Sequence, residues 1–299
     1  MPAPLAVAFV IREKFAWALA SLRRLYAFAE TPFTLYFVDG RYPAEVRPQI
    51  DAFLAEKDNV VRIAADRFLY PAEALNLVLE RATETFTFLL QNDVLIGRGV
   101  PALLLDSAAR LGADVVMPVI LDNDQGDGTP GQHRDSDEPV LFHDGADGIR
   151  ALADAAPEWK DGCRRIHYFE NHCLLARTAL LRAAGPFAPI SAYDHVEICV
   201  SLWRQGAVAY AQPRARVLFM DTPPLPLRAY ECPFFRFRWD LTRARLSHAY
   251  MVGHWKMQNL FDKSPFVARQ HLALQPGAVL DAYAPPFATD SAPEEFASA

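Results

Sequence analysis

The sequence predicts an α/β fold in which helices cover a mixed, mostly parallel β-sheet. Two observations carry this prediction. Short apolar runs of β type alternate with stretches of helical spacing over about the first 120 residues, and turn residues separate them. Hydrophobic residues make up 52% of the 299 residues and charged residues 22%, which is typical of a soluble globular chain with a sizeable core.

The first elements follow from local pattern. An apolar run predicts a strand over residues 5–11, and apolar residues at helical spacing predict a helix over 15–28. A second strand over 33–38 stops at the turn dipeptide Asp39-Gly40. The elements that follow are a helix over 46–54, a strand over 60–63, a helix over 72–82 opened by Pro71, a strand over 85–90, a helix over 101–111 and a strand over 114–121.

An acidic segment over 122–148 interrupts the alternation. It holds eight acids and one arginine, so its charge is −7, whereas the whole chain carries −6. The acidity is therefore local. Beyond it we expect a helix over 174–184, a helix over 196–205, a strand over 207–211 and helical structure over 235–261.

These shifts in composition predict three parts. Residues 1–220 form the α/β domain with 122–148 as an insertion, 221–284 form a helical extension, and 285–299 form a disordered tail of small and acidic residues.

Several classes of protein are disfavoured. The first strand runs into Ile11-Arg12-Glu13-Lys14 without a glycine, and no phosphate-binding glycine loop follows elsewhere, which argues against ordinary NAD and P-loop chemistry. The net negative charge argues against a nucleic-acid partner. Four cysteines without a CxxC pair predict free thiols, and no signal peptide or membrane span is evident, so we expect a cytoplasmic protein.

Two acids stand where predicted strands end, which is where parallel sheets bind ligands. Asp39 follows the second strand and Asp93 follows the fourth. A carboxylate at this edge can accept a hydrogen bond from a base or ribose, or can hold Mg²⁺ or Mn²⁺. The structural alternatives are a turn former for Asp39 and a cap for Asp93.

A third acidic group, Asp194-His195-Val196-Glu197, opens a predicted helix. Asp194 and Glu197 have the spacing of a capping box, and one of Asp194, His195 and Glu197 could instead be a general base. The segment 122–128 imitates a calcium loop, but the twelfth position is His133 rather than Glu, so we interpret it as a solvated loop.

The segment 233–271 combines aromatic side chains with seven Lys or Arg residues. We expect its aromatic face to pack across the α/β core while its basic face stays solvated. An acceptor lid or peripheral contact with the inner face of a membrane is the alternative, and a nucleic-acid patch is the least favoured.

Six motifs in register carry a resemblance to a family. The chain resembles the family-2 glycosyltransferases, which have the glycosyltransferase A-type fold, over roughly residues 5–220. The motifs are Leu35-Tyr36-Phe37-Val38-Asp39-Gly40, Ala74-Leu75-Asn76-Leu77-Val78-Leu79, Phe88-Leu89-Leu90-Gln91-Asn92-Asp93, Glu170-Asn171-His172 with Leu174-Leu175-Ala176-Arg177, Gly185-Pro186-Phe187, and Asp194-His195-Val196-Glu197 with Trp203-Arg204-Gln205-Gly206.

The resemblance implies transfer of a sugar, with inversion, from a nucleotide-sugar donor to a glycan, lipid-linked or other hydroxyl acceptor. It implies that a divalent metal, Mn²⁺ or Mg²⁺, assists by neutralising the leaving diphosphate. The residues it assigns to donor and cofactor binding are Arg12, Asp39, Asn76, Asn92 and Asp93. The metal ligands would be Asp93 and Asp221, and the base would be Asp194, His195 or Glu197.

The chain also departs from the family pattern. Gln91 replaces the first acid of the metal motif, His195 stands at the usual position of the base, and Met220 and Asp221 stand where many members place a histidine. A nucleotidyltransferase, or an inactive nucleotide- or carbohydrate-binding module of the same fold, therefore remains as an alternative.

Overall fold

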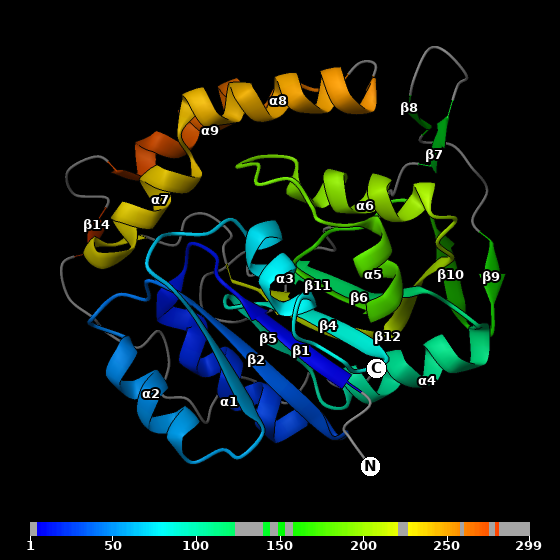
Figure 1. Ribbon diagram of the computed structural model, residues 1–299, viewed down its shortest axis with the longest axis horizontal. Helices are drawn as coiled ribbons and strands as arrows, with labels where there is room; N and C mark the ends of the chain where they lie inside the picture. The colour runs from blue at the N-terminus through cyan, green and yellow to red at the C-terminus, as the bar shows by residue number, and fades with distance from the viewer. Residues whose placement is uncertain are drawn as a thin grey trace.

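The computed structural model describes residues 5–122, 140–143, 149–152, 158–220, 227–257, 260–274 and 279–280. Figure 1 shows a central mixed sheet with helices on both faces and further helices along one rim. The strand order is β3-β2-β1-β4-β11-β6-β12-β10-β9, with β5 paired to β12. The strands are β1 Leu5–Val10, β2 Phe33–Gly40, β3 Val60–Ala65, β4 Phe86–Gln91, β5 Val94–Ile96, β6 Val115–Asp122, β9 Trp159–Lys160, β10 Cys163–Ile166, β11 Cys173–Arg177 and β12 Ala209–Phe219.

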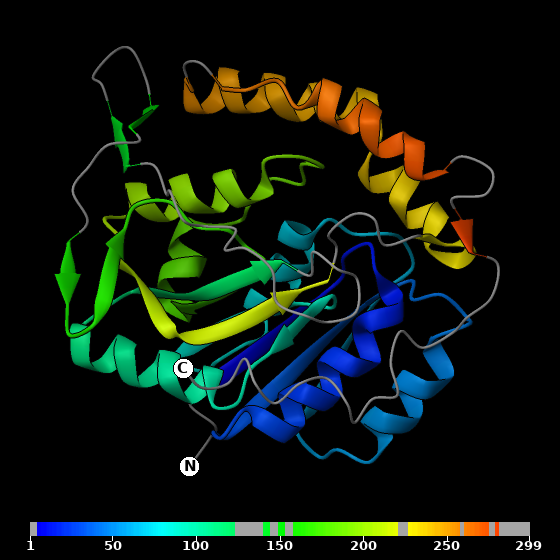
Figure 2. The same cartoon turned by 180° about the vertical axis from the view of Figure 1, so that it is seen from behind.

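Helices cover the sheet from two sides, as the views from front and behind agree (Figures 1 and 2). The helices are the 3₁₀ turn η1 Phe15–Trp17, α1 Ala18–Phe28, α2 Arg47–Ala55, α3 Pro71–Leu79, α4 Val100–Leu111, α5 Thr178–Ala184, α6 Asp194–Arg204, η3 Ala229–Glu231, α7 Cys232–Arg238, α8 Leu241–Trp255, α9 Ser264–Gln270 and η4 His271–Leu274. Two short strand pairs, β7 Val140–His143 with β8 Ile149–Leu152 and β13 Leu227–Arg228 with β14 Val279–Leu280, stand apart from the main sheet.

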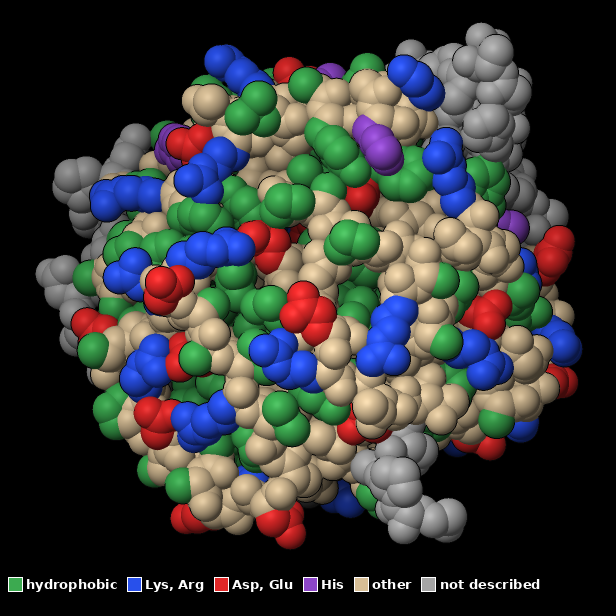
Figure 3. Space-filling model, in the orientation of Figure 1, with side chains coloured by type: hydrophobic (Ala, Val, Ile, Leu, Met, Phe, Trp, Pro, Cys, Tyr) green, Lys and Arg blue, Asp and Glu red, His purple; other side chains and the backbone are tan. Residues whose placement is uncertain are grey.

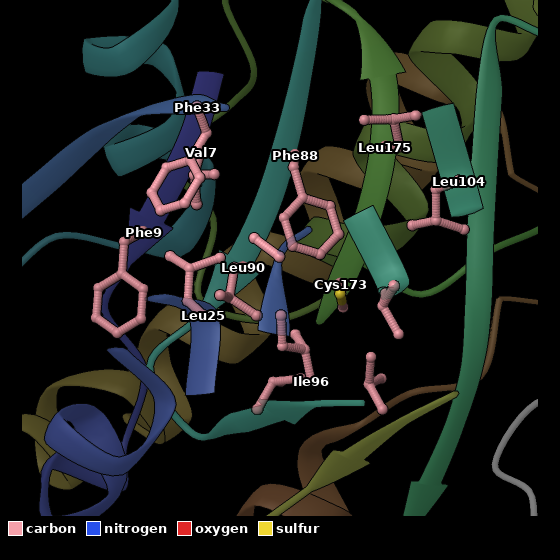
Figure 4. Packing of buried hydrophobic residues seen from close by; sticks show 14 of the residues in the cluster. Val7, Phe9, Leu25, Phe33, Phe88, Leu90, Ile96, Leu104, Cys173 and Leu175 are labelled. Carbon is pink, nitrogen blue, oxygen red and sulfur yellow. The ribbon is translucent and has the colours of Figure 1, made fainter. Parts of the chain in front are cut away.

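Strand β1 shows how the sheet divides the core. Its side chains alternate between two faces, as the period of a strand requires. Leu5, Val7 and Phe9 face the cluster built with α1, α2 and α4, part of which Figure 4 shows. Ala6 and Ala8 belong to the cluster built with α3, α5 and α6. Burial on both faces explains the continuous apolar run of this parallel strand.

The predicted α/β class is confirmed, and one of the predicted elements is partly wrong. The expected helix over 174–184 begins as β11, which lies antiparallel between β4 and β6, and only its second half is α5. A short buried apolar run has no periodicity that separates strand from helix. The expected helical structure over 235–261 is present as two helices that meet at Trp239, because Asp240 caps a new helix by accepting a hydrogen bond from the Arg243 N–H at 2.8 Å.

Strand β12 is longer than the predicted 207–211 and runs on to Phe219, with an irregularity between Gln212 and Arg216. Pro213 lies at this irregularity, and proline cannot donate to a ladder. The antiparallel pairs of the sheet all involve β5, β9, β10 or β11, none of which the sequence predicted.

The helical extension packs across the α/β domain as expected of most of its aromatic side chains, although Phe261 is exposed and the cation Arg238 is buried. The ring of Phe234 on α7 contacts Phe15 and Phe68 edge to face at 5.3 and 5.4 Å between centroids. Met251 and Trp255 on α8 join the core cluster of α3, α5 and α6. The domain boundaries remain predictions, and most of the acidic insertion and the whole tail lie outside the described residues.

All four cysteines are buried free thiols. Of the helices in the described ranges, none combines the length and apolar character that crossing a bilayer requires.

Candidate active site

Three strand ends meet at one edge of the sheet. Strands β1, β2 and β4 are parallel neighbours, with Leu5 in register with Phe33 and Phe86. Their carboxyl ends therefore bring together the loop after β1, Asp39, and the Gln91-Asn92-Asp93 segment, as the order of predicted strands implied. This edge is where the sequence placed the donor site.

Amide side chains tie the loop after β1 to the end of β4. The Gln91 Oε1 accepts from Arg12 Nη1 at 3.2 Å and lies 2.9 Å from His172 Nδ1, while its Nε2 donates to the Asn171 carbonyl at 3.2 Å. The Asn92 Oδ1 accepts from the Arg12 backbone N–H, and its Nδ2 donates to the Lys14 carbonyl at 3.3 Å. Gln91 and Asn92 are fully buried, so their amides position this edge of the sheet.

Only one of the two expected metal ligands, Asp93, lies within the described residues. Within those ranges, no group of three His, Cys, Asp or Glu side chains could hold a metal ion. The Gln91 and Asn92 amide oxygens already accept from Arg12, and Asp93 is fully buried. Hard cations such as Mg²⁺ are commonly held by one or two carboxylates together with waters and substrate phosphates, so Asp93 would need further oxygen ligands from a bound diphosphate, from water or from other residues. Asp221 lies outside the described residues.

A chain of buried charges runs from this loop into the helical extension. Arg12 Nε lies 3.0 Å from Glu13 Oε2, Arg238 Nε lies 3.1 Å from Glu13 Oε1, and Arg238 Nη2 lies 3.3 Å from Asp194 Oδ1. Each of these side chains is at most 8% exposed. Buried charges are costly unless they are paired, and here positive and negative groups alternate along the chain. We call Arg12, Glu13, Arg238 and Asp194 the buried charge chain.

Asp194 is held as a carboxylate. Burial raises the pKa of this carboxyl, but the charge of Arg238 and the neighbouring His195 and Arg12 outweigh burial and bring its pKa well below the ordinary value of 3.8. Asn171 Nδ2 also donates to Asp194 Oδ2 at 3.0 Å. Asp194 is therefore ionised at neutral pH and binds a proton poorly.

His195 lies between two carboxylates. Its Nδ1 is 3.8 Å from Asp194 Oδ1, and its Nε2 is 3.9 Å from Glu170 Oε1. The side chain is 12% exposed, and the ring meets Tyr168 edge to face at 6.0 Å. An imidazole in this position can take up a proton while neighbouring carboxylates stabilise the resulting cation.

Glu197 belongs to a different set of contacts. One turn further along α6, it accepts from the Trp255 indole N–H, from the Tyr250 hydroxyl at 3.2 Å and from the Ala188 N–H at 3.3 Å. Tyr250 and Trp255 both lie on α8. The carboxylate of Glu197 thus fastens the helical extension to α6.

A pocket of about 420 Å³ opens beside the end of β2. Its walls include the rings of Phe15, Tyr42, Phe68 and Tyr230. The hydroxyl of Tyr42 is buried and has no hydrogen-bond partner among the described residues. Burial, then the charges of Asp39 and Asp93, raise the pKa of Tyr42 well above its ordinary value, so this hydroxyl stays neutral.

Asp39 lies next to this pocket with its carboxylate partly committed. Arg47 donates through both Nη1 and Nη2, the latter at 2.9 Å to Oδ1, and the Tyr42 N–H donates to Oδ1 at 3.3 Å. Asn76 is fully committed elsewhere: its Oδ1 and Nδ2 bond the Phe187 N–H and carbonyl at 3.0 and 2.9 Å. Asn76 therefore positions the loop at Gly185-Pro186.

Sequence reasoning missed Glu13, Asn171 and Arg238 as parts of this site. Glu13 was visible as a charge directly after a buried strand. Arg238 lies 225 residues from Glu13 in a segment rich in arginine, and nothing in the local pattern distinguishes it from its neighbours.

Comparisons with solved structures identify the fold. GalNAc-T7, solved with UDP, GalNAc and Mn²⁺, is similar to this chain with a TM-score of 0.56 and 11% identity over 91% of this chain and 55% of its own. The mannosyltransferase PcManGT of Pyrobaculum calidifontis, solved with GDP-Man and Mn²⁺, has a TM-score of 0.54 and 13% identity over 91% and 70%. TarS 1–349 of S. aureus has a TM-score of 0.52 and 16% identity over 91% and 71%.

The chain has a glycosyltransferase A-type fold. This confirms the fold that the six motifs implied. The chain spans only about half the length of GalNAc-T7, and likeness at this level of identity concerns architecture rather than activity. No protein-family model matches the chain, and no curated protein matches it in sequence.

Proposed function

We propose that this chain transfers a sugar from a nucleotide-sugar donor to an acceptor hydroxyl, with inversion. The proposal rests on the position of the His195 imidazole between the carboxylates of Asp194 and Glu170. The buried charge chain connects Asp194 to the loop after β1. The solved structures with UDP and with GDP-Man have the same fold, which supports a nucleotide-sugar as the donor.

The donor would lie along the carboxyl edge of the sheet. The pocket beside β2 lies within the size range of small-molecule sites, and its aromatic walls suit a stacked base. Asp39 and the Tyr42 hydroxyl would contact the nucleoside there. Arg12 and Lys14 follow β1 and would supply positive charge toward the diphosphate.

His195 would act as the general base. It takes the acceptor proton as the acceptor oxygen attacks the anomeric carbon from the face opposite the nucleoside diphosphate. One carbon–oxygen bond forms while the bond to the diphosphate breaks, and the diphosphate leaves with the electron pair, so the configuration inverts. Asp194 would stabilise the protonated imidazole, since its own pKa is too low for it to take the proton at neutral pH. Glu197 is not part of this mechanism, because three donors on other segments occupy its carboxylate.

The metal ligands Asp93 and Asp221 stay a prediction. Mn²⁺ is present in two of the similar structures, whereas the described residues here supply no ligand group for it. Calorimetric titration of UDP, GDP, CDP and dTDP, each with and without Mn²⁺, measures both the nucleotide preference and the dependence on metal.

Turnover then tests the base. His195→Asn should lower the rate of nucleotide release by about 10²–10⁴-fold while the dissociation constant for the nucleotide is nearly unchanged. His167→Asn, at a partly buried histidine directly after β10, is the matched control and should keep full turnover. Full turnover in His195→Asn would show that His195 is not the general base. Binding of a nucleotide without turnover of any donor would favour an inactive binding module, and release of pyrophosphate would favour a nucleotidyltransferase.

A further inference from the structure

The helical extension exposes large hydrophobic side chains. Five large hydrophobic side chains are exposed among the described residues, and four of them lie in this extension. Their exposed fractions are 66% for Leu246, 40% for Val252, 67% for Phe261 and 58% for Leu272. Single exposed hydrophobic residues are common on protein surfaces, but this concentration in one short segment is not.

Helix α8 is apolar on two opposite faces. Ala244, Ser247, Met251 and Trp255 are buried against the rest of the chain. Leu246, Ala249 and Val252, spaced by three residues, lie exposed on the other side. A surface helix of a globular protein normally carries polar residues on its outer face, whereas here exposed apolar side chains stand between Arg245 and Lys256, which points to a contact outside this chain.

The same surface is cationic although the whole chain is acidic. Residues 241–274 contain five Lys or Arg residues and a single acid, Asp262, whereas the chain carries −6. Arg245, Lys256 and Arg269 are exposed among the hydrophobic side chains. Figure 3 shows hydrophobic and Lys or Arg side chains intermixed along the upper rim, where Figure 1 places α8. We call Arg245, Leu246, Val252, Lys256, Phe261 and Arg269 the α8–α9 surface.

Hydrogen bonds fix helix α8 to helix α6 and to the loop before it. Glu197 on α6 bonds Tyr250 and Trp255, and the Ser247 hydroxyl accepts from the Ser191 N–H at 3.1 Å. The outer face of α8 therefore cannot turn inward without breaking buried hydrogen bonds.

We propose that the α8–α9 surface docks on an anionic lipid bilayer. Hydrophobic side chains would enter the boundary between headgroups and acyl chains, while the cations would pair with lipid phosphates, as in amphipathic helices that lie in the membrane plane. The excess of positive charge on this surface fits a negatively charged membrane and not a neutral one. This proposal does not depend on the transferase activity.

Vesicle co-sedimentation of the full chain tests it. Binding is measured to vesicles of phosphatidylcholine alone and of phosphatidylcholine with phosphatidylglycerol, at low and high salt. We expect binding to the anionic vesicles only, weakened by salt. Replacing both Leu246 and Phe261 by Ser should lower the affinity at least about tenfold, and Arg245→Gln or Arg269→Gln should each lower it about fivefold.

Matched controls lie outside the surface. Trp159→Ser removes an exposed aromatic side chain from β9, and Arg214→Gln removes an exposed cation from β12, and both should bind as the unaltered protein does. Because every altered side chain is exposed, circular dichroism should show unchanged folding. Equal binding to neutral vesicles, or no loss in the Leu246 and Phe261 variant, would overturn the proposal. So would a concentration-dependent dimer that this variant abolishes, because the surface would then bind a second copy of the chain.

Discussion

Arg238 offers a direct test of how the extension is bound to the domain. In Arg238→Met a side chain of similar length replaces the guanidinium, so packing is largely kept while Glu13 and Asp194 lose their shared partner. Removing one member of a buried ion pair costs about 3–5 kcal/mol, because the remaining charge is left uncompensated. We expect a value within this range and not twice as large, since Arg12 still pairs with Glu13 and Asn171 still bonds Asp194.

The assay is urea unfolding followed by tryptophan fluorescence. With a slope of about 3 kcal/mol per molar, this loss of stability lowers the midpoint by about 1–1.7 M while the slope stays unchanged. Arg214→Met, at an exposed arginine, is the control and should leave the midpoint in place. Adding Glu13→Gln to Arg238→Met should restore part of the loss, because the remaining buried charges, Arg12 and Asp194, then sum to zero.

The effect should depend on pH in a defined direction. The pKa of Asp194 lies below its unfolded value of 3.8, so its ionisation stabilises the protein above that pH, and this contribution is lost as pH falls through the folded pKa. Without Arg238, burial raises that pKa, and Asp194 becomes neutral in the folded variant at a higher pH. The gap between variant and parent should therefore narrow between about pH 7 and pH 4. Equal midpoints at neutral pH, or a gap that widens in acid, would refute the reasoning.

Three further substitutions separate positioning residues from binding residues. Glu197→Gln should lower the free energy of unfolding by about 1–3 kcal/mol in the same assay, because it weakens the hydrogen bonds between α6 and α8. Turnover per folded molecule should stay close to normal. A loss of turnover without a loss of stability would make Glu197 a catalytic residue. Asn76→Ala leaves the buried Phe187 N–H and carbonyl unsatisfied and should cost about 1–3 kcal/mol in thermal unfolding, and Asn76→Asp should lose at least as much, because its carboxylate cannot donate to the Phe187 carbonyl. Tyr42→Phe removes a buried hydroxyl that has no partner among the described residues, so calorimetry should show unchanged or slightly higher stability and a nucleotide affinity about five- to tenfold weaker; unchanged affinity would place the nucleoside elsewhere.

Local pattern predicted most of the first half of the fold because each element there has its own signature. Residues 60–63 and 85–90, for example, lie within or next to the observed β3 and β4. Prediction from local pattern failed at Cys173–Arg177, where a short, mostly apolar run forms an antiparallel strand and not the start of a helix. Pairing with β4 and β6 decides this, and pairing partners lie far away in the sequence.

The sequence by itself determined which residues reach the carboxyl edge of the sheet. The order of strands places Asp39 and Asp93 there, and the acidic start of α6 brings Asp194 and His195 as a unit. Those conclusions need only strand direction and helix spacing, which short stretches of chain encode.

Only the tertiary structure decided what each of these side chains can do. Asp194 and Glu197 are both acids in the first turn of one helix, yet Asp194 meets Arg238 while Glu197 meets Tyr250 and Trp255. Burial and ion pairing set the protonation of a carboxylate, and both depend on distances between segments that are remote in the chain. The separation of 44 residues between Asp194 and Arg238 carries no periodicity that a sequence pattern could record.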